Sequence, residues 1–322
     1  MSKKTAVMIC GHGSRDVEAI QEFDLLALHL RQRLPQYDVE SGFLEFARPV
    51  LREGFDKLTE RGAERILALP AMLFAAGHVK NDLPSEVNAF AADHPELEVN
   101  YGRELAVDLK LLRVASERIA AAEQASTRKI SRAETLLMVV GRGTNDPDAN
   151  SNISKVARML WEGMGFGWAE ASYSGVASPL VDAGLDHAAK LGYKRIIVFP
   201  YFLFTGILVK RIYDWTDEAA AKYPDVEFLK AAYLRDHPLV IDAFVERLNE
   251  LVEGNPAMNC QLCKYREQAI GYERDVGAVQ EGHHHHVRGI GTDGDHDHGH
   301  GHGHGHDHPH PHGHGHDHGH EH

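Results

Sequence analysis

Residues 10–16 read Cys-Gly-His-Gly-Ser-Arg-Asp and directly follow the apolar run Thr5 to Ile9, which places His12 in a glycine turn after a predicted strand. The arrangement returns 130 residues later, where residues 140–146 read Val-Gly-Arg-Gly-Thr-Asn-Asp after another apolar run. The second copy keeps both turn glycines and has Arg142 in place of the histidine. A repeated strand and glycine turn predicts a duplicated domain whose halves differ in chemistry.

The same offset relates many other positions that shape a backbone or a core. The matched pairs are Pro49 and Pro179, Gly54 and Gly184, Gly62 and Gly192, Arg65 and Arg195, Pro70 and Pro200, Phe74 and Phe204, Val79 and Val209, and Lys80 and Lys210. Two similar halves facing each other would leave a cleft, and ligands of such sheets bind beyond the carboxyl ends of the strands.

Short β-branched runs alternate with amphipathic helical stretches, which predicts an α/β fold with a parallel sheet flanked by helices in each half. The predicted strands are Thr5 to Ile9, Val39 to Phe43, Arg65 to Leu69, Glu96 to Asn100, Thr135 to Val140, Ala169 to Tyr173, Arg195 to Phe199 and Val226 to Lys230. The last helix of each half is expected at Ala106 to Ala122 and at Pro238 to Val252.

These patterns divide the 322 residues into five parts. They are a domain at 1–122, a polar linker at 123–134, a duplicated domain at 135–254, a segment with two cysteines at 255–282, and a histidine-rich tail at 283–322. The tail holds 18 of the 24 histidines, interleaved with glycine and aspartate, and without an apolar run it is expected to stay disordered.

Charge, hydropathy and cysteine content indicate which partners and which cellular compartment to expect. A net charge of −13 argues against nucleic acid as a partner. The most membrane-like stretch, 196–209, contains Pro200 and Gly206 and is shorter than the roughly 20 residues of a spanning helix. Three cysteines do not form a disulfide framework, and no export signal is recognisable, so we expect a cytoplasmic protein.

Three chemically able side chains follow the first three predicted strands, namely His12, Glu45 and His78. The carboxyl ends of parallel strands share one edge of the sheet, so these side chains are expected to converge there. Two imidazoles and a carboxylate can hold a divalent metal loosely or accept protons near neutral pH. The corresponding positions of the second half are Arg142, Gly175 and Leu208. The chemistry is therefore predicted in the first half alone.

Other reaction classes are less well supported. The chain has no phosphate-binding loop of the Gly-x-x-x-x-Gly-Lys-Ser/Thr type, and Gly11-His12-Gly13 lacks the third glycine of a dinucleotide fingerprint. Ser14 has no nucleophile elbow around it, which makes hydrolase chemistry weaker still. Cys10 corresponds to Val140 and is interpreted as a buried thiol.

The motifs Gly-His-Gly-Ser around His12, Phe43-Leu-Glu45 and Ala-Gly-His-Val-Lys-Asn-Asp-Leu-Pro at 76–84 resemble those of the class II tetrapyrrole chelatases. The tandem halves, the Met-Asn-Cys-Gln-Leu-Cys motif at 258–263 and the histidine-rich tail are similar to the long CbiX type of that family. The resemblance implies insertion of Co²⁺ into sirohydrochlorin without ATP, in an early cobalt-insertion route to cobalamin.

The resemblance assigns the chemistry to His12, Glu45 and His78, and makes the second half the opposite wall of the cleft. As a hypothesis, the histidines coordinate the entering ion and accept pyrrole protons, while Glu45 orients a histidine or takes a proton or metal contact. Sirohydrochlorin is rich in carboxylates, so an acidic protein needs local cations to bind it. The predicted contacts are Arg142 first, with Arg48, Lys80 and Lys210.

Cys260 and Cys263 by themselves fit a redox dithiol, half of a zinc site or part of an iron–sulfur cluster. The resemblance implies a 4Fe-4S cluster, which needs about four thiolates. We therefore expect a cluster shared across a homodimer or completed by other ligands. Two further alternatives stay open: insertion of iron or nickel into the same ring, and a cobalt or nickel storage or chaperone protein whose function is the metal-binding tail.

Overall fold

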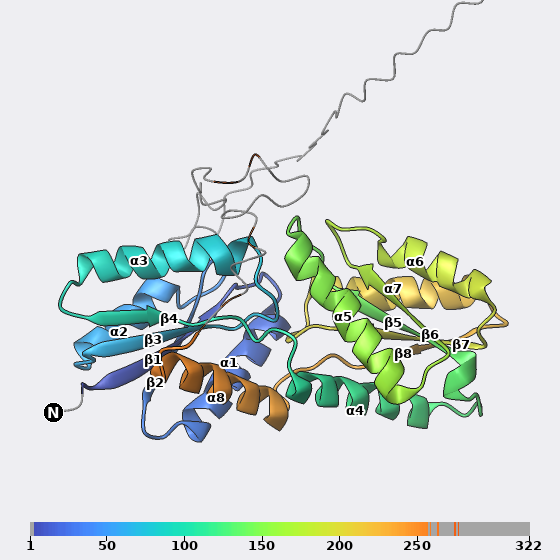
Figure 1. Cartoon of the computed structure of the whole chain (residues 1–322), viewed down its shortest axis with the longest axis horizontal. Helices are drawn as coiled ribbons and strands as arrows, with labels where there is room; N and C mark the ends of the chain where they lie inside the picture. The colour runs from blue at the N-terminus through green and yellow to red at the C-terminus, as the bar shows by residue number, and fades with distance from the viewer. Residues whose placement is uncertain (1–2, 257, 259–262, 264–273, 275, 277–322) are drawn as a thin grey trace, which may run out of the picture. The chain divides into compact units, whose positions relative to one another are not determined.

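The computed structural model describes residues 3–256 and positions 258, 263, 274 and 276. This part of the chain contains two four-stranded parallel sheets, with the strand orders β2-β1-β3-β4 and β6-β5-β7-β8 (Figure 1). The identical orders confirm the predicted duplicated α/β fold. Cys260 and the histidine-rich tail lie outside the described residues.

The first half alternates strands and helices along the chain. Its elements are β1 (Thr5–Gly11), α1 (Val17–Arg33), β2 (Asp38–Phe43), α2 (Leu51–Glu60), β3 (Arg65–Pro70), the π-helical turn η1 (His78–Asp82), α3 (Leu83–Asp93), β4 (Glu98–Tyr101) and α4 (Leu109–Ala125).

The second half repeats this order. Its elements are the 3₁₀ turn η2 (Arg132–Glu134), β5 (Thr135–Gly141), α5 (Pro147–Met164), β6 (Trp168–Tyr173), α6 (Val181–Ala188), the 3₁₀ turn η3 (Ala189–Leu191), β7 (Arg195–Pro200), α7 (Ile207–Lys222), β8 (Glu227–Lys230) and α8 (Pro238–Val252). The strands agree with the predicted ones to within two residues at each end.

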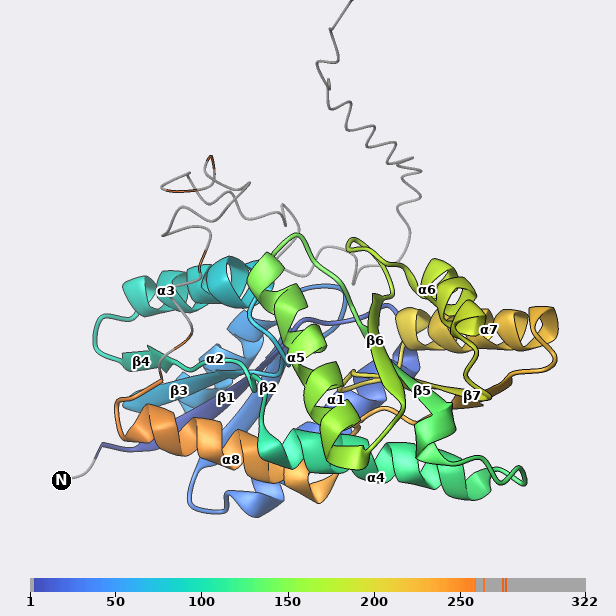
Figure 2. The ribbon, with the colours of Figure 1, turned by 45° about the vertical axis from the view of Figure 1, so that its right-hand side comes forward.

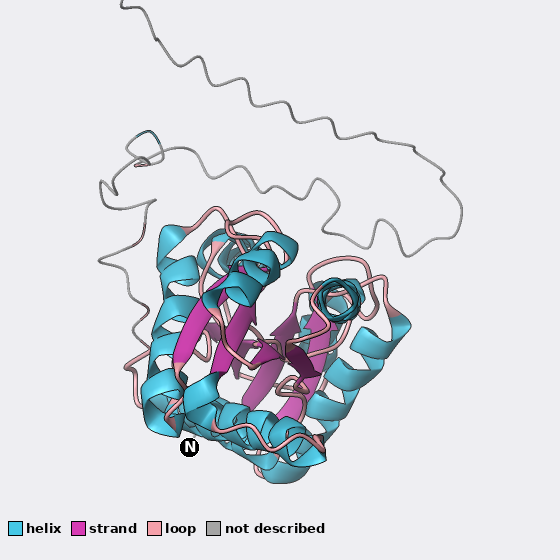
Figure 3. Ribbon diagram, turned by 90° about the vertical axis from the view of Figure 1, so that its right-hand side faces the viewer, coloured by secondary structure: helices cyan, strands magenta, loops and turns pink. Residues whose placement is uncertain are grey.

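After an initial threonine, the central strands β1 and β5 are apolar, as expected of parallel strands with helices on both faces of the sheet (Figure 3). In the first sheet Cys10 lies level with Gly42 of β2 and Pro70 of β3. The loops that follow these three strands therefore leave the sheet at one edge. The register of the second sheet is equivalent, with Val140 level with Ser172 and Pro200.

The last helix of each half packs on the sheet of the other half. Helix α8 contacts β3 and α1 of the first half, whereas α4 contacts β7, β8 and α5 of the second (Figures 1 and 2). The two exchanged helices also pack on each other. Arg103 and Asp108, which precede α4, form ion pairs with Glu250 and Arg247 of α8.

This exchange joins the two halves into one core. A single apolar cluster takes Val7 and Leu67 from the first sheet, Leu137 and Ile197 from the second, and the buried faces of α1, α4, α5 and α8. The outer face of each sheet has its own smaller cluster. The predicted domain boundary between residues 122 and 123 stays a prediction. Because α4 and α8 each pack on the other half, the core does not divide at that point of the chain.

None of the helices among the described residues is both long and apolar enough to cross a membrane.

Candidate active site

His12, Glu45 and His78 come together in the structure, as their positions after three neighbouring strands predict. The Nε2 atoms of His12 and His78 are 2.9 Å apart, and Glu45 Oε1 lies 3.3 Å from His12 Nε2. His12 follows β1, Glu45 follows β2, and His78 begins η1 after β3. Both imidazoles are partly open to solvent, whereas Glu45 is buried.

The glycine turn is what allows Glu45 to approach His12. Gly13 has a φ of 99°, and a Cβ atom placed there would lie 1.7 Å from the Glu45 carbonyl oxygen. The Glu45 backbone N–H donates to the His12 carbonyl at 3.0 Å, which ties the two loops together. A side chain at position 13 would therefore separate the carboxylate from the imidazole.

Hydrogen bonds at the far sides of both rings define the state of the histidine pair. His12 Nδ1 lies 2.9 Å from the Gly13 carbonyl oxygen, which can only accept, so Nδ1 carries the proton. His78 Nδ1 lies 2.7 Å from Asp82 Oδ2 and donates in the same way. Both Nε2 atoms then turn lone pairs toward each other, an arrangement that can hold a metal ion between the two rings.

The distance between the two Nε2 atoms suits a metal ion. Two nitrogens bound at about 2.0–2.1 Å and at right angles lie roughly 2.9 Å apart. Among the described residues, however, no group of three or more histidine, cysteine or acidic side chains is arranged to hold a metal as it stands. A metal ion would have to replace the contact between the imidazoles and draw in Glu45.

The electrostatics of Glu45 follow from its position. Burial raises the pKa of the Glu45 carboxyl above its ordinary value, and the charge of Asp82 raises it further. His78 and Arg142 lower the pKa and partly offset this effect. Glu45 is thus a carboxyl group that holds a proton more readily than an exposed one.

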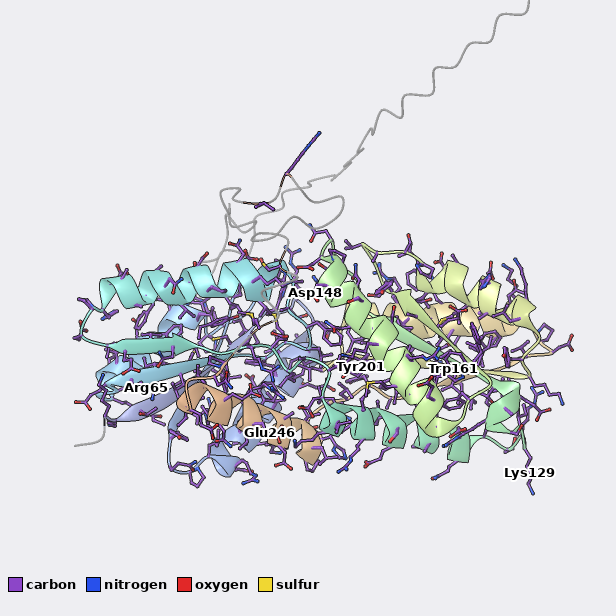
Figure 4. The ribbon with its side chains drawn as sticks, in the orientation of Figure 1. Arg65, Lys129, Asp148, Trp161, Tyr201 and Glu246 are labelled. Carbon is purple, nitrogen blue, oxygen red and sulfur yellow. The ribbon has the colours of Figure 1, made fainter. Side chains whose placement is uncertain are left out.

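A pocket of about 540 Å³ opens beside the histidine pair and is lined by both halves. The first half contributes His12, His78 and Phe46, and the second half contributes Arg142 and Phe204 among others. Tyr201, between the two halves in Figure 4, stacks on Phe74 with ring centroids 5.6 Å apart. The pocket therefore combines apolar aromatic walls with a reactive end.

Two guanidinium groups line the same pocket. Arg142 occupies the place of His12 in the second half, and partial burial lowers its pKa while Glu45 opposes that change. Arg15, which sequence reasoning missed as a site residue, lies over the Phe46 ring at 5.1 Å from its centroid. Arg15 belongs to the motif at residues 10–16, which could have marked it as a candidate. The sequence does not show, however, that its side chain points into the pocket.

The other predicted substrate contacts lie elsewhere among the described residues. Lys80 is buried against Asp146 and Asp148, at 2.7 and 3.1 Å. Lys210 pairs with Asp16 and Glu18, each at 2.9 Å. Arg48 is exposed and pairs with Glu53 at 2.8 Å. None of the three lines the pocket, so the geometry favours Arg142 and Arg15 as the cations that meet a ligand.

The cysteines are placed only in part. Cys10 is fully buried in β1, where burial raises the pKa of its thiol. Cys263 is buried and not disulfide-bonded, and the predicted cluster ligand Cys260 lies outside the described residues. Since Cys10 is enclosed in the core, one chain offers two thiolates, fewer than the four of a cubane cluster. The donor set of a single chain does not fit a 4Fe-4S cluster.

The structure thus has two α/β halves and, at the edge of one sheet, a pair of imidazoles of a kind that can bind a metal ion or accept protons. The chain belongs to the CbiX family, whose model matches residues 6–122 and 136–251. The two matched stretches correspond to the two halves of the structure.

The relatives with named activities handle the same ring and different metals. The chain is 36% identical to a sirohydrochlorin cobaltochelatase of Priestia megaterium, over 81% of this chain and 84% of that protein. It is 32% identical to a sirohydrochlorin ferrochelatase of the same organism, over 72% and 85% of the two chains. The solved structure of SirB from Bacillus subtilis with Fe³⁺ is similar with a TM-score of 0.70 and 26% identity, over 80% of this chain and all of that one.

Proposed function

We propose that this protein inserts a divalent metal ion, Co²⁺, into sirohydrochlorin without ATP. The observation that carries the proposal is the pair of imidazole Nε2 atoms 2.9 Å apart, beside a buried carboxyl group, at the end of a pocket lined by both halves. The named relatives support sirohydrochlorin as the substrate. Cobalt is favoured by the higher identity and the longer match to the cobaltochelatase.

The pocket suits a flat macrocycle with charged edges. Aromatic side chains such as Phe46, Phe74 and Phe204 offer apolar walls for the ring faces. Arg15 and Arg142 come from opposite halves and can each pair with a carboxylate at the edge of the ring. The ring would then lie between the halves, with its centre toward His12 and His78.

The chemistry follows from what the ring must lose. A free tetrapyrrole gives up two pyrrole protons as the metal enters, and a hydrated metal ion must shed water. His12 and His78 would bind the ion through their facing Nε2 atoms and then accept the protons, because neutral imidazole does both near pH 7. Glu45 would contact the ion or pass on a proton. Loose coordination helps, since a closed four-ligand site would retain the metal.

The proposal is tested by following the visible spectrum of sirohydrochlorin with the full-length protein and Co²⁺. We expect His12→Ala and His78→Ala each to lower the insertion rate by about 10²–10⁴-fold, the usual effect of removing one acid–base group. His94→Ala is the matched control, because His94 lies at the end of α3 and pairs with Glu96. Wild-type rates in both site variants would refute the assignment.

The same assay separates the alternatives. Repeating it with Fe²⁺ and Ni²⁺ tests the ferrochelatase and nickelochelatase functions, which the ligand types by themselves do not distinguish. A cobalt or nickel storage protein would bind the ions and leave the rate of the spectral change unaltered. Removal of the chain from Gly282 onward tests metal supply by the predicted tail. We expect loss of turnover at scarce metal and none at saturating metal.

The iron–sulfur cluster stays a separate proposal for Cys260 and Cys263. Since one chain supplies only two cysteines besides the core residue Cys10, we propose that a cluster is shared across a homodimer or completed by other ligands. Iron and sulfide analysis of protein purified without oxygen, together with its mass in solution, tests this. Zinc in place of iron and sulfide would refute it. The cytoplasmic location likewise remains an expectation.

A further inference from the structure

The helix after the third strand differs between the halves by one residue. At its start, buried Val79 corresponds to buried Val209, with an offset of 130. Four residues later, buried Leu83 corresponds to buried Ile212, with an offset of 129. The new offset persists to the end of the helices, where His94 and Tyr223 are equivalent C-caps. The first half therefore carries one extra residue between Val79 and Leu83.

The extra residue is accommodated as a π-helical turn. Residues His78–Asp82 form η1, and the N–H of Leu83 bonds to the His78 carbonyl, five residues back. The second half has no such turn, since α7 is α-helical from Ile207 onward. Single π-turns inside helices are rare and concentrate at functional sites. Here the turn begins at His78 itself.

The wider turn places two polar side chains in the interior beside His78. Asn81 and Asp82 are each only 5% exposed. Asp82 Oδ2 lies 2.7 Å from His78 Nδ1, and Asp82 Oδ1 accepts a hydrogen bond from Asn81 Nδ2 at 2.8 Å. Asp82 precedes α3, yet its side chain makes no capping hydrogen bond to that helix. Its carboxylate is directed to the histidine.

We propose that Asp82 is a positioning residue that fixes the tautomer and the direction of His78. By accepting the Nδ1 proton, the carboxylate keeps the Nε2 lone pair of His78 turned toward His12 and the pocket. Asn81 holds the carboxylate in that orientation through the opposite oxygen. The second half, where Leu208 replaces the histidine, also lacks the inserted residue and the aspartate. The effect of Asp82 on the tautomer of His78 is independent of the proposed function. Only its expected effect on metal insertion rests on that function.

The direct test is the tautomer of His78, measured by long-range ¹H–¹⁵N NMR of the metal-free full-length protein at about pH 8, where an ordinary imidazole is neutral. The His78 signals are identified by comparison with His78→Gln. We expect a single Nδ1–H tautomer in the wild type and a shift toward the Nε2–H form in Asp82→Ala. An unchanged tautomer in Asp82→Ala would overturn the proposal.

Glu104 provides the matched control. It is 7% exposed, lies in the same half, and has a buried oxygen with no hydrogen-bond partner among the described residues. We expect Glu104→Ala to leave the His78 signals unchanged. An equal shift in Glu104→Ala would show that loss of any buried carboxyl group disturbs the loop, and would refute a specific role for Asp82.

Kinetics provides the second readout. Asp82→Ala should lower kcat for metal insertion by roughly 10–100-fold, the usual effect of losing such a partner, and leave KM for sirohydrochlorin within about 2-fold. If Asp82→Ala does not fold, Asp82→Asn takes its place. Its amide oxygen would accept from Asn81, so its N–H would face His78 Nδ1 and is expected to favour the Nε2–H form. Wild-type kcat and tautomer in Asp82→Asn would then overturn the proposal. A wild type that holds the tautomer but inserts no metal would refute the proposed function and not this inference.

Discussion

At the scale of single residues, the pocket is defined by charges that come from opposite halves. Arg142 stands where the first half has His12, so the second half carries a guanidinium group where the first half carries an imidazole. Arg15 has no cationic counterpart, because the matching position of the second half is Asn145. The two arginines therefore place one positive charge on each wall of the pocket.

We expect Arg142→Ala to raise KM for sirohydrochlorin about 10-fold, since a charge-assisted hydrogen bond contributes roughly 1.5–3 kcal/mol. The effect should shrink at high salt, which screens accessible charges. Steady-state insertion kinetics at two ionic strengths measure both. Arg52→Ala is the control, as Arg52 is half-buried and pairs with Asp93 outside the pocket. An unchanged KM in Arg142→Ala would remove Arg142 from the binding site.

Glu104 predicts a pH dependence of stability. Burial raises the pKa of its carboxyl above the ordinary value of 4.5, with Asp148 adding to this and Arg103 and Lys80 opposing it. The folded protein then holds the proton more tightly than the unfolded chain, so this group's contribution is lost as pH rises above 4.5.

Glu104→Gln cannot titrate and should be more stable than the wild type at neutral pH, by roughly 1 kcal/mol. The gain should disappear toward pH 4, where the wild-type carboxyl is also protonated. Urea unfolding across this pH range measures the difference. A gain that is independent of pH would contradict the assigned ionisation.

The sequence predicts the meeting of His12, Glu45 and His78 because parallel strands end at one edge, whatever the details of their loops. It does not predict the roles of Asp82 or Lys80. Asp82 reaches His78 only because the helix contains a π-turn. The helix propensities of the residues in this stretch do not predict that turn. Lys80 forms ion pairs with two aspartates that are distant in sequence, and these contacts hold it outside the pocket.

At the scale of elements, the π-turn reconciles two demands on one helix. Leu83, Val87 and Phe90 must face the core, and His78 must face the pocket. One residue corresponds to a rotation of about 100° around a helix. An uninterrupted α-helix of this sequence would satisfy one demand and lose the other.

Deletion of Asn81 should restore the α-helical register seen in α7. In that register the equivalent residue Leu208 lines the pocket, so His78 is expected to stay at the pocket. Asp82, however, would lie three instead of four residues after His78 and would lose its bond from Asn81. We expect a folded protein with metal insertion reduced at least 10-fold, because His78 would lose the carboxylate that orients it. Circular dichroism and the spectral assay measure the two properties. Deletion of Lys129, exposed in the linker (Figure 4), is the control and should leave both unchanged. Full activity without Asn81 would contradict a role for the π-turn.

At the scale of the whole molecule, two equivalent ion-pair clusters join the halves. Lys80 binds Asp146 and Asp148, and the equivalent Lys210 binds Asp16 and Glu18. Asp16 and Asp146 also cap α1 and α5, so each lysine ties one half to the first turn of a helix in the other. Asp148 lies in the first turn of α5, beside the first half (Figure 4).

The two clusters differ in burial, and this predicts different energies. The Lys80 side chain is 6% exposed and that of Lys210 is 49% exposed. Lys80→Met should therefore destabilise the protein by about 3–5 kcal/mol, because it leaves two carboxylates without their buried partner. Lys210→Met, its matched control, should have a much smaller effect. Urea unfolding measures both, and equal losses would show that burial does not decide the energy here.

The exchange of α4 and α8 is the feature of the whole molecule that the sequence leaves open. Hydrophobic periodicity shows that a helix has a buried face, but it does not say which sheet covers that face. Two ion pairs form only in the exchanged arrangement, Arg103 with Glu250 and Asp108 with Arg247. These pairs join residues far apart in the chain, so they become recognisable once the fold is known.

The exchange predicts what a single half does by itself. Residues 1–126 would expose the sheet face that α8 covers, including Val7, Ile9 and Leu69, and also the apolar face of α4. Two copies can satisfy both surfaces by giving each other α4, as the two halves of the full chain do. We therefore expect this fragment to be a dimer in solution, with two histidine pairs facing one pocket. Analytical ultracentrifugation measures its mass. A fragment ending at residue 107 should fail to form a stable dimer because it has no helix to exchange, and a folded monomer of 1–126 would show that α4 can cover its own sheet.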